Sequence, residues 1–233
     1  MNNAYYLIID IIAFILFAIL HSILASFKIK SLFTKHLKSA MAFYRIVYNI
    51  FFLFLFFYLF ENLPRPDVEL FELKFPWDII ILVPQFLSLA GIIWTLRYFS
   101  LSEFAGLSQI KRWKNGSFIV YDENKESKTE THTEDLQNSE YSENVFDENL
   151  TLKIEGPYKV VRHPLYLFTL IFLTLRPTMD LFYLVFLIFL IAYFYIGSFY
   201  EEKKLVSAFG DQYRKYQKSV PRLFPIGSPG PHN

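Results

Sequence analysis

The stretch GPYKVVRHPLYLFTLIFLTLRP, residues 156–177, joins a charged, proline-broken segment to an almost unbroken apolar run. Proline is favoured in the first turn of a helix, because the amide hydrogen that it lacks would have no partner there. Pro164 therefore predicts a helix start, with Arg162 and His163 at its mouth. Polar side chains at the entrance of an apolar helix indicate a site at the surface of an apolar layer.

Apolar windows of membrane-spanning length flank this stretch. Hydrophobic residues make up 53% and aromatic residues 20% of the chain, and a membrane helix needs about 20 mostly apolar residues. The windows that qualify are residues 5–26, 42–60, 79–99 and 179–200. Residues 165–175 are short for a span, and only Arg176, Pro177 and Thr178 separate them from the last window. The predicted fold is an all-α integral membrane protein with five transmembrane helices, the last two forming a helical hairpin.

The charge of the short loops predicts the orientation, because Lys and Arg are enriched in cytoplasmic loops. The loop after the first window is basic, with Lys28, Lys30, Lys35 and Lys38, whereas the loop after the second window is acidic. The tail after the last window is also basic, with Lys203, Lys204, Arg214, Lys215, Lys218 and Arg222. Both observations place the amino terminus outside and the carboxy terminus in the cytoplasm. The predicted location is the bacterial inner membrane.

Composition divides the chain into three parts. Residues 1–100 hold the first three helices, residues 101–155 form a cytoplasmic connection, and residues 156–233 hold the last two helices and the tail. Within the connection, residues 122–149 are an acidic, polar insert typical of a disordered loop. In residues 201–218, apolar side chains at helical spacing predict a cytoplasmic amphipathic helix. These side chains are Leu205, Phe209, Tyr213 and Tyr216. Gly210 is expected to weaken this helix at its centre.

Composition also excludes several kinds of site. The chain has no cysteine, which excludes disulfides, thiolate metal sites and a cysteine nucleophile. Its five histidines are scattered and form no pair at a metal-binding spacing, so no metal is expected. The net charge of +1 is segregated by region, which indicates no nucleic-acid partner. The lipid bilayer is the expected partner, and the oligomeric state stays open.

The predicted hairpin gathers charged residues at one membrane face, since it brings the start of one helix beside the end of the other. Arg162 and His163 open the fourth helix, and Glu201 and Glu202 close the fifth. Ionisable residues in membrane helices are costly and are therefore functional candidates. The helix start also favours an anion. The expected aromatic walls of this pocket are Tyr158, Tyr166 and Tyr213.

A pocket that is cationic on one side and anionic on the other suits a zwitterionic cofactor with a sulfonium. The carboxylate of such a cofactor is expected to face Arg162, His163 and the helix start at Pro164, with its amino group or ribose toward Glu201 and Glu202. For any one of these residues the alternative is an ordinary interfacial anchor. That alternative does not account for the whole cluster.

The same residues carry a resemblance to a known superfamily. GPYxxVRHPxY at residues 156–166 and EExxLxxxFGxxYxxYxxxVPRxxP at residues 201–225 resemble the isoprenylcysteine carboxyl methyltransferase and phospholipid methyltransferase superfamily. The resemblance implies a membrane-embedded enzyme that uses S-adenosylmethionine. It also implies the residues that hold this cofactor: His163, Tyr166, Glu201 and Glu202, with Arg162 and Arg222 nearby. The chain departs from many relatives at Phe168, where they have glycine.

Three shorter segments narrow the resemblance. SEFAGLSQI at residues 102–110 and RPTM at residues 176–179 resemble the methanethiol S-methyltransferase branch. LHSILASFK at residues 20–28 resembles that branch and the related NnrU-like membrane proteins. The acidic residues 122–149 form an insertion relative to the branch.

The expected reaction is methyl transfer to a small or lipophilic thiol by a single in-line displacement, which needs alignment and exclusion of water. A neutral thiol must also lose its proton, and a nearby carboxylate or basic group can assist. The expected catalytic residues are Glu103, Glu202 and Arg222. Two other acceptors, a prenylcysteine carboxylate and a phospholipid amine, stay open. A non-catalytic NnrU-like protein is the alternative outside the enzyme class.

His21 lies inside the first window and has two open interpretations. A histidine in a membrane helix is costly enough to indicate a substrate or proton contact. It can equally form a hydrogen bond to a neighbouring helix.

Overall fold

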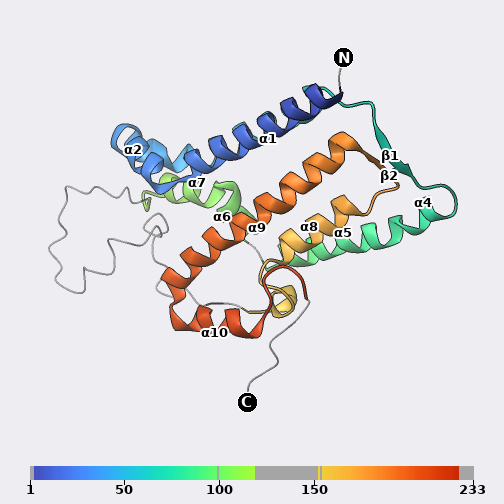
Figure 1. The fold of residues 1–233 in the computed structure, drawn as a ribbon. Coiled ribbons are helices and arrows are strands. Elements are labelled where there is room, and N and C mark those ends of the chain that lie inside the picture. Colours follow the sequence, from blue (N-terminus) through green and yellow to red (C-terminus); the bar gives the residue numbers. More distant parts are fainter. Residues whose placement is uncertain (1–2, 99, 119–151, 153, 226–233) are drawn as a thin grey trace.

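The computed structural model describes residues 3–98, 100–118, 152 and 154–225 (Figure 1). The elements of the amino-terminal half are α1 (Asn3–Ala25), α2 (Phe27–Leu37), η1 (Lys38–Phe43), α3 (Tyr44–Asn62), β1 (Glu69–Glu72), α4 (Trp77–Ile80), α5 (Leu82–Leu96), α6 (Leu101–Ala105) and α7 (Leu107–Lys114). The elements that follow are η2 (Gly156–Lys159), α8 (Pro164–Thr174), β2 (Thr178–Asp180), α9 (Leu181–Phe209) and α10 (Asp211–Ser219). The predicted insert at residues 122–149 lies outside the described residues.

Four helical stretches of the described chain are long and apolar enough to cross a membrane. They are Asn3–Ala25, Lys28–Asn62, Trp77–Leu96 and Leu181–Phe209. Their outward faces carry bare apolar side chains: Phe54 is 71% exposed, Phe86 63% and Leu87 66%. Exposed apolar surface on this scale is rare in water-soluble proteins, and it supports the predicted membrane protein.

The predicted fourth span is confirmed as a helix but not as a span. Helix α8 has 11 residues, which at 1.5 Å per residue is about 16 Å, whereas the hydrocarbon core is about 30 Å thick. Helix α8 lies between α5 and α9 and runs antiparallel to α9 (Figure 1). The hairpin is therefore present, but with one short arm and one long arm.

The turn of the hairpin contains a short strand, which corrects the all-α prediction in one detail. Strand β2 pairs antiparallel with β1, so the acidic loop after α3 is tied to the hairpin turn. Asp180 caps α9 by accepting a hydrogen bond from the backbone amide of Tyr183 at 2.8 Å. The Tyr183 hydroxyl donates to the carbonyl of Leu173 at 2.9 Å and fixes the two arms together.

Aromatic rings hold α1 and α3 against α9. Phe14 of α1 is buried and stacks on Phe189 at a centroid distance of 5.2 Å. Phe60 of α3 meets Phe182 and Phe186 edge-on at 5.5 and 5.4 Å. Because this packing fixes α1 beside α9, it places polar residues of the two helices opposite one another.

Phe168, the departure from the superfamily pattern, packs against a glycine of another helix. A β-carbon added to Gly91 of α5 would overlap the Phe168 ring. The missing side chain on α5 thus leaves the space that the Phe168 ring fills. This contact explains how α8 accepts a large ring at that position.

The predicted amphipathic helix over residues 201–218 is divided by Gly210. Helix α9 continues without a break from the apolar run to Phe209. Gly210 has φ +55°, which L residues rarely adopt, and the chain turns there into α10. The prediction of one separate helix is therefore wrong at its start, although the weak point at Gly210 is confirmed.

Candidate active site

The two sequence motifs are hydrogen-bonded to each other through their backbones. The amide of Arg162 donates to the carbonyl of Pro221 at 2.9 Å, and the amide of His163 donates to that of Arg222 at 3.1 Å. The Arg162 guanidinium also donates to the carbonyl of Gln217 at 2.8 Å, at the end of α10. Carbonyl groups at a helix end lack partners within the helix and favour a cation. The paired segments therefore fix α10 over the start of α8.

Glu202 is the centre of this assembly, and both of its oxygens are occupied. Oε1 accepts from Arg162 Nε at 2.7 Å and lies 3.2 Å from His163 Nε2. Oε2 accepts from Gln217 Nε2 at 2.9 Å, Arg222 Nη2 at 2.9 Å and Arg162 Nη2 at 3.2 Å. The Glu202 side chain is only 3% exposed. A buried carboxylate needs such partners, because desolvating an unpaired charge is very costly.

Glu201, the next residue along α9, is far more open. Its side chain is 49% exposed. It accepts a hydrogen bond from the Tyr166 hydroxyl at 3.1 Å and lies 3.3 Å from His163 Nδ1. Two adjacent carboxylates are thus held differently: Glu202 is enclosed by protein, and Glu201 faces outward with spare acceptor capacity.

His163 bridges the two carboxylates. Burial lowers the pKa of His163, but the hydrogen bonds and charges of Glu201 and Glu202 outweigh it and raise that pKa above its ordinary value of 6.5. The ring stacks on Tyr166 at 5.3 Å, and Tyr166 stacks on Phe194 at 4.5 Å. This three-ring stack runs from the charged cluster into the apolar layer.

Arg222 keeps one hydrogen-bond donor unused. Its guanidinium carbon lies 3.6 Å from the ring centroid of Phe199, and its Nη2 binds Glu202. Its Nε is buried and has no partner among the described residues. A buried donor without a partner is rare in proteins, so this atom indicates a place for an acceptor that the protein does not itself provide.

Two of the aromatic residues predicted to line the pocket, Tyr158 and Tyr213, take part in the packing of α10. Tyr213 is 2% exposed and packs edge-on against Tyr216 at 5.6 Å. The Tyr216 hydroxyl donates to the carbonyl of Tyr158. Burial, and then the charge of Glu201, raise the pKa of Tyr158. Tyr213 therefore belongs to the buried face of α10, and Tyr158 is joined to that helix through the Tyr216 hydroxyl.

Glu103 of α6 makes its contacts with α7 and α3. It accepts from Arg112 Nη1 at 2.8 Å and Nη2 at 3.1 Å, and from Gln109 Nε2 at 3.1 Å. Burial raises the pKa of Glu103, but the hydrogen bonds and charge of Arg112 outweigh it, and the pKa is lowered. Its own carbonyl accepts from Arg45 at 2.8 Å. These contacts fix α6 to α7 and α3, whereas the other predicted site residues gather around Glu202 and Tyr216.

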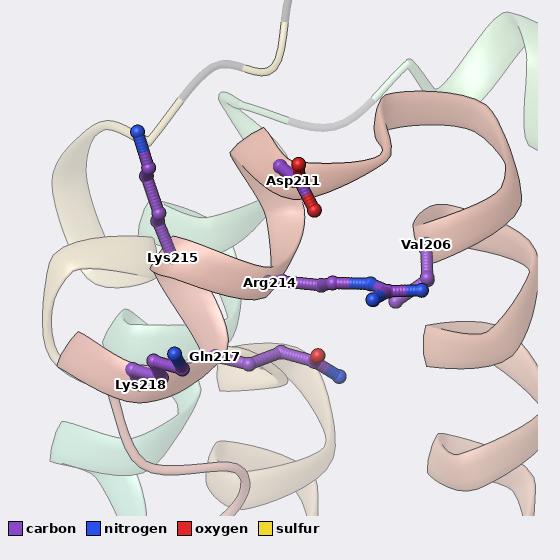
Figure 2. Close-up of a pocket in the computed structure, with 6 residues that line it drawn as sticks. All are labelled: Val206, Asp211, Arg214, Lys215, Gln217 and Lys218. Atoms are coloured by element: carbon purple, nitrogen blue, oxygen red, sulfur yellow. The ribbon is translucent and has the colours of Figure 1, made fainter.

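A shallow pocket of about 680 Å³ is lined by Val206 of α9 and by residues of α10. Figure 2 shows Arg214 and Gln217 directed from α10 toward Val206 of α9, with Lys215 directed away. Gln217 lines this pocket and also belongs to the charged cluster, because its side-chain amide donates to Glu202.

His21 and Tyr193 form a second polar contact inside the helix bundle. His21 Nδ1 lies 2.6 Å from the Tyr193 hydroxyl, and the carbonyl of His21 accepts from Tyr48 at 3.0 Å. Four aromatic rings surround the imidazole at centroid distances of 4.7–6.0 Å: Phe17, Tyr48, Phe52 and Tyr193. The interhelical hydrogen bond is one of the two interpretations that the sequence left open.

The sequence does not mark Tyr193, Phe194 and Gln217 as parts of these sites. Tyr193 and Phe194 lie inside an apolar run, where a ring is the common residue. Phe194 lies seven residues before Glu201, close to two full helical turns, and this spacing was the available signal. Gln217 gave none, since glutamine in a polar helix has no distinguishing pattern.

The assembly brings both signs of charge together in one cluster. Arg222 Nε is an unused donor, the first turn of α8 presents backbone amides that favour anions, and Glu201 is an open acceptor. Such a set can bind a small zwitterion. The described residues contain no group of three His, Cys, Asp or Glu that could hold a metal ion.

Comparison with known proteins gives short regions of similarity. The chain is 46% identical over 68 residues to a methanethiol S-methyltransferase of Pseudomonas deceptionensis, which covers 29% of this chain and 26% of that protein. It is 38% identical over 68 residues to methanethiol S-methyltransferase 1 of Bradyrhizobium diazoefficiens, covering 29% and 24%. It is 36% identical over 77 residues to a methanethiol S-methyltransferase of Crocosphaera subtropica, covering 32% and 30%.

The chain thus spans about a quarter of the length of the curated relatives that it matches. No family model and no solved structure matches it. The similarities support the methanethiol S-methyltransferase branch of the resemblance over that part of the chain.

Proposed function

We propose that this chain is an integral-membrane methyltransferase that uses S-adenosylmethionine and transfers a methyl group to a small or lipophilic thiol. The observation that carries the proposal is the contrast within one assembly: Glu202 is filled by protein partners, while Arg222 Nε and Glu201 beside it have unused capacity. The names of the similar proteins support methyl transfer to a thiol.

The residues present fit a sulfonium zwitterion. Arg222 Nε and the first turn of α8, which begins at Pro164, suit a carboxylate. Glu201 suits an ammonium group. The half-buried ring of Phe194, at the end of the three-ring stack, suits a sulfonium, because a cation is attracted to an aromatic face. When bound, S-adenosylmethionine supplies an electrophilic methyl group.

Glu202 acts in this proposal as a positioning residue. Its oxygens are already shared among Arg162, His163, Gln217 and Arg222, so it has little capacity to take a proton. Its negative charge holds the two guanidinium groups and the imidazole in place. Glu103 likewise holds α6 and α7 through Arg112, and we assign neither carboxylate to proton transfer.

We also propose the orientation that the charge of the loops predicts. Helix α10 and the charged cluster lie at the end of the bundle opposite β1 and β2 (Figure 1), and the basic residues of the tail lie at the cluster end. We place this end at the cytoplasmic face, where a water-soluble cofactor enters. An apolar acceptor then arrives through the lipid along the exposed apolar faces.

Calorimetry of the purified protein with S-adenosylmethionine, and with its demethylated product, tests the proposal. Wild type is expected to bind both, and Glu201→Gln is expected to weaken binding about tenfold or more while thermal unfolding stays unchanged. Glu155→Gln, the same change at another exposed acid, serves as the control and is expected to bind as wild type does. Absence of binding to wild type would refute the cofactor assignment, and unchanged binding by Glu201→Gln would refute the role of that residue.

A further inference from the structure

The His21 and Tyr193 contact is a polar feature of the bundle that the cofactor site leaves unused. His21 Nδ1 has the Tyr193 hydroxyl at 2.6 Å. Nε2 makes no hydrogen bond with any described residue. The imidazole therefore has one nitrogen fixed by a partner and one nitrogen available.

The surroundings of this nitrogen are aromatic. Rings of α1, α3 and α9 surround the imidazole, and the polar groups next to it are the hydroxyls of Tyr48 and Tyr193. No charged side chain of the described residues forms an ion pair with it. An apolar guest suits this cage better than a charged one.

The pair lies on the same helix as the charged cluster. Tyr193 is eight residues before Glu201 on α9, which corresponds to about 12 Å along the helix. Its neighbour Phe194 stacks on Tyr166, whose hydroxyl binds Glu201. An acceptor at His21 would therefore lie about two helical turns from a cofactor whose charged groups are at Glu201.

The hydrogen bond can define the state of the ring. A phenol hydroxyl accepts as well as donates, so Nδ1–H of His21 can donate to the Tyr193 hydroxyl. In that tautomer Nε2 carries the lone pair. In catalytic histidines in general, the hydrogen bond made by one ring nitrogen determines whether the other nitrogen carries a proton.

We propose that His21 Nε2 is the general base that removes the proton of the acceptor thiol, with Tyr193 as the residue that fixes its tautomer. The inference rests on the proposed function and deepens it, because it names the residue that ionises the acceptor thiol. The S–H bond breaks and its proton moves to Nε2, giving an imidazolium. The sulfur electron pair then forms a bond to the methyl carbon, while the methyl–sulfonium bond breaks and its electron pair stays on the departing sulfur.

A base at this place distinguishes the acceptors. A thiol has a pKa of about 8.5 and is mostly neutral near pH 7, whereas a terminal carboxylate has a pKa of about 3.5 and is already ionised. A carboxylate acceptor therefore needs no base. A neutral thiol in an aromatic cage does, since its anion is the nucleophile.

Raman spectroscopy of a bound thiol tests its contact with Nε2 without the methyl donor. The chain has no cysteine, so any S–H stretching band comes from the ligand, here ethanethiol. Wild type is expected to shift the S–H band of the bound thiol to lower frequency, because the thiol donates a hydrogen bond to Nε2. His21→Asn, which keeps a hydrogen-bonding group near the position of Nδ1, is expected to leave the band unshifted. An unshifted band in wild type, or an equal shift in His21→Asn, would overturn the proposal.

Steady-state kinetics with ethanethiol and S-adenosylmethionine are the second test of this proposal. His21→Asn and His21→Gln are expected to lower kcat about 100-fold, with cofactor binding by calorimetry within twofold of wild type. Tyr193→Phe is expected to lower kcat about tenfold. Tyr195→Phe, the same change on an exposed face of α9, is expected to leave kcat unchanged. Equal losses at the two tyrosines, or full activity of both His21 variants, would overturn the inference.

These outcomes separate the inference from the proposed function. A wild type that binds the cofactor and methylates ethanethiol, with fully active His21 variants, refutes the base alone. A wild type that neither binds the cofactor nor methylates the thiol refutes the function and the base together. Thermal unfolding of each variant shows whether a loss comes from a damaged fold.

Discussion

Two polar centres of this protein differ in how completely their hydrogen bonds are filled. Around Glu202, two arginines, a histidine and a glutamine occupy both carboxylate oxygens. Around His21, one nitrogen binds Tyr193 and the rest of the contact surface is aromatic. A filled centre stabilises the geometry of a site, whereas an unfilled one keeps the capacity to react. The difference predicts that changes at the first centre cost stability and changes at the second cost activity.

The largest expected effect is at the filled centre. Glu202→Ala leaves the guanidinium of Arg162, whose side chain is 8% exposed, without its carboxylate. Removing one partner of a buried ion pair costs about 3–5 kcal/mol. We expect a loss of that size in the free energy of unfolding, measured in detergent. His21→Asn is the contrast and should lose about 1 kcal/mol or less, and a reversed order would contradict the comparison.

The next effect tests how α8, which follows His163, is held in place. Gly91→Ala adds a methyl group where the Phe168 ring lies, and overpacking costs about 1–3 kcal/mol. The double variant with Phe168→Ala should recover part of this loss, because the added methyl then has space. A double-mutant cycle by thermal unfolding measures the coupling. Additive losses would show that the two positions do not share this contact.

The filled centre should also respond to pH through His163. Its pKa is raised in the fold, so the protonated ring stabilises the folded state fully below its ordinary value of 6.5, and this stabilisation is lost as pH rises through the higher folded value. We expect the thermal midpoint to fall over that window in wild type. His163→Gln should flatten the dependence. Parallel pH curves for the two proteins would contradict the bridging role of His163.

The smallest expected effect concerns Glu103. Both of its carboxylate oxygens accept hydrogen bonds, but its side chain is more exposed than that of Glu202. Its ion pair with Arg112 has side chains 37% and 28% exposed, and exposed pairs contribute about 0.2–1 kcal/mol. Glu103→Gln should therefore change stability by no more than this and methyl transfer by no more than about twofold. A loss of 100-fold in kcat with an intact fold would instead support the catalytic role that the sequence predicts for Glu103.

The sequence predicts the meeting of Arg162 and His163 with Glu201 and Glu202, because a three-residue connection forces two apolar segments to lie side by side. It also predicts the break at Gly210. It does not distinguish the two glutamates, since both are adjacent acids at a helix end. Only the turn at Gly210, which brings Gln217 back onto α9, decides which of them is enclosed.

Other features depend on contacts between distant segments, which a pattern along one segment cannot show. The space for Phe168 is created by Gly91, and the hydrogen bond of His21 requires Tyr193 from the far end of the chain. The short strands are not predicted from the sequence either, because the residues of Glu69–Glu72 have no alternating polar and apolar pattern. In each case the deciding partner lies on another element.

The central claim is methyl transfer to a thiol, and the most direct measurement follows the methyl group itself. Purified protein is incubated with ethanethiol and S-adenosylmethionine carrying an isotopic label in its methyl group, and the volatile thioether is analysed by mass spectrometry. The account predicts labelled ethyl methyl sulfide in equal amount to the demethylated cofactor, with a large loss in Glu201→Gln and His21→Asn. No labelled thioether from folded, cofactor-binding wild type would contradict it.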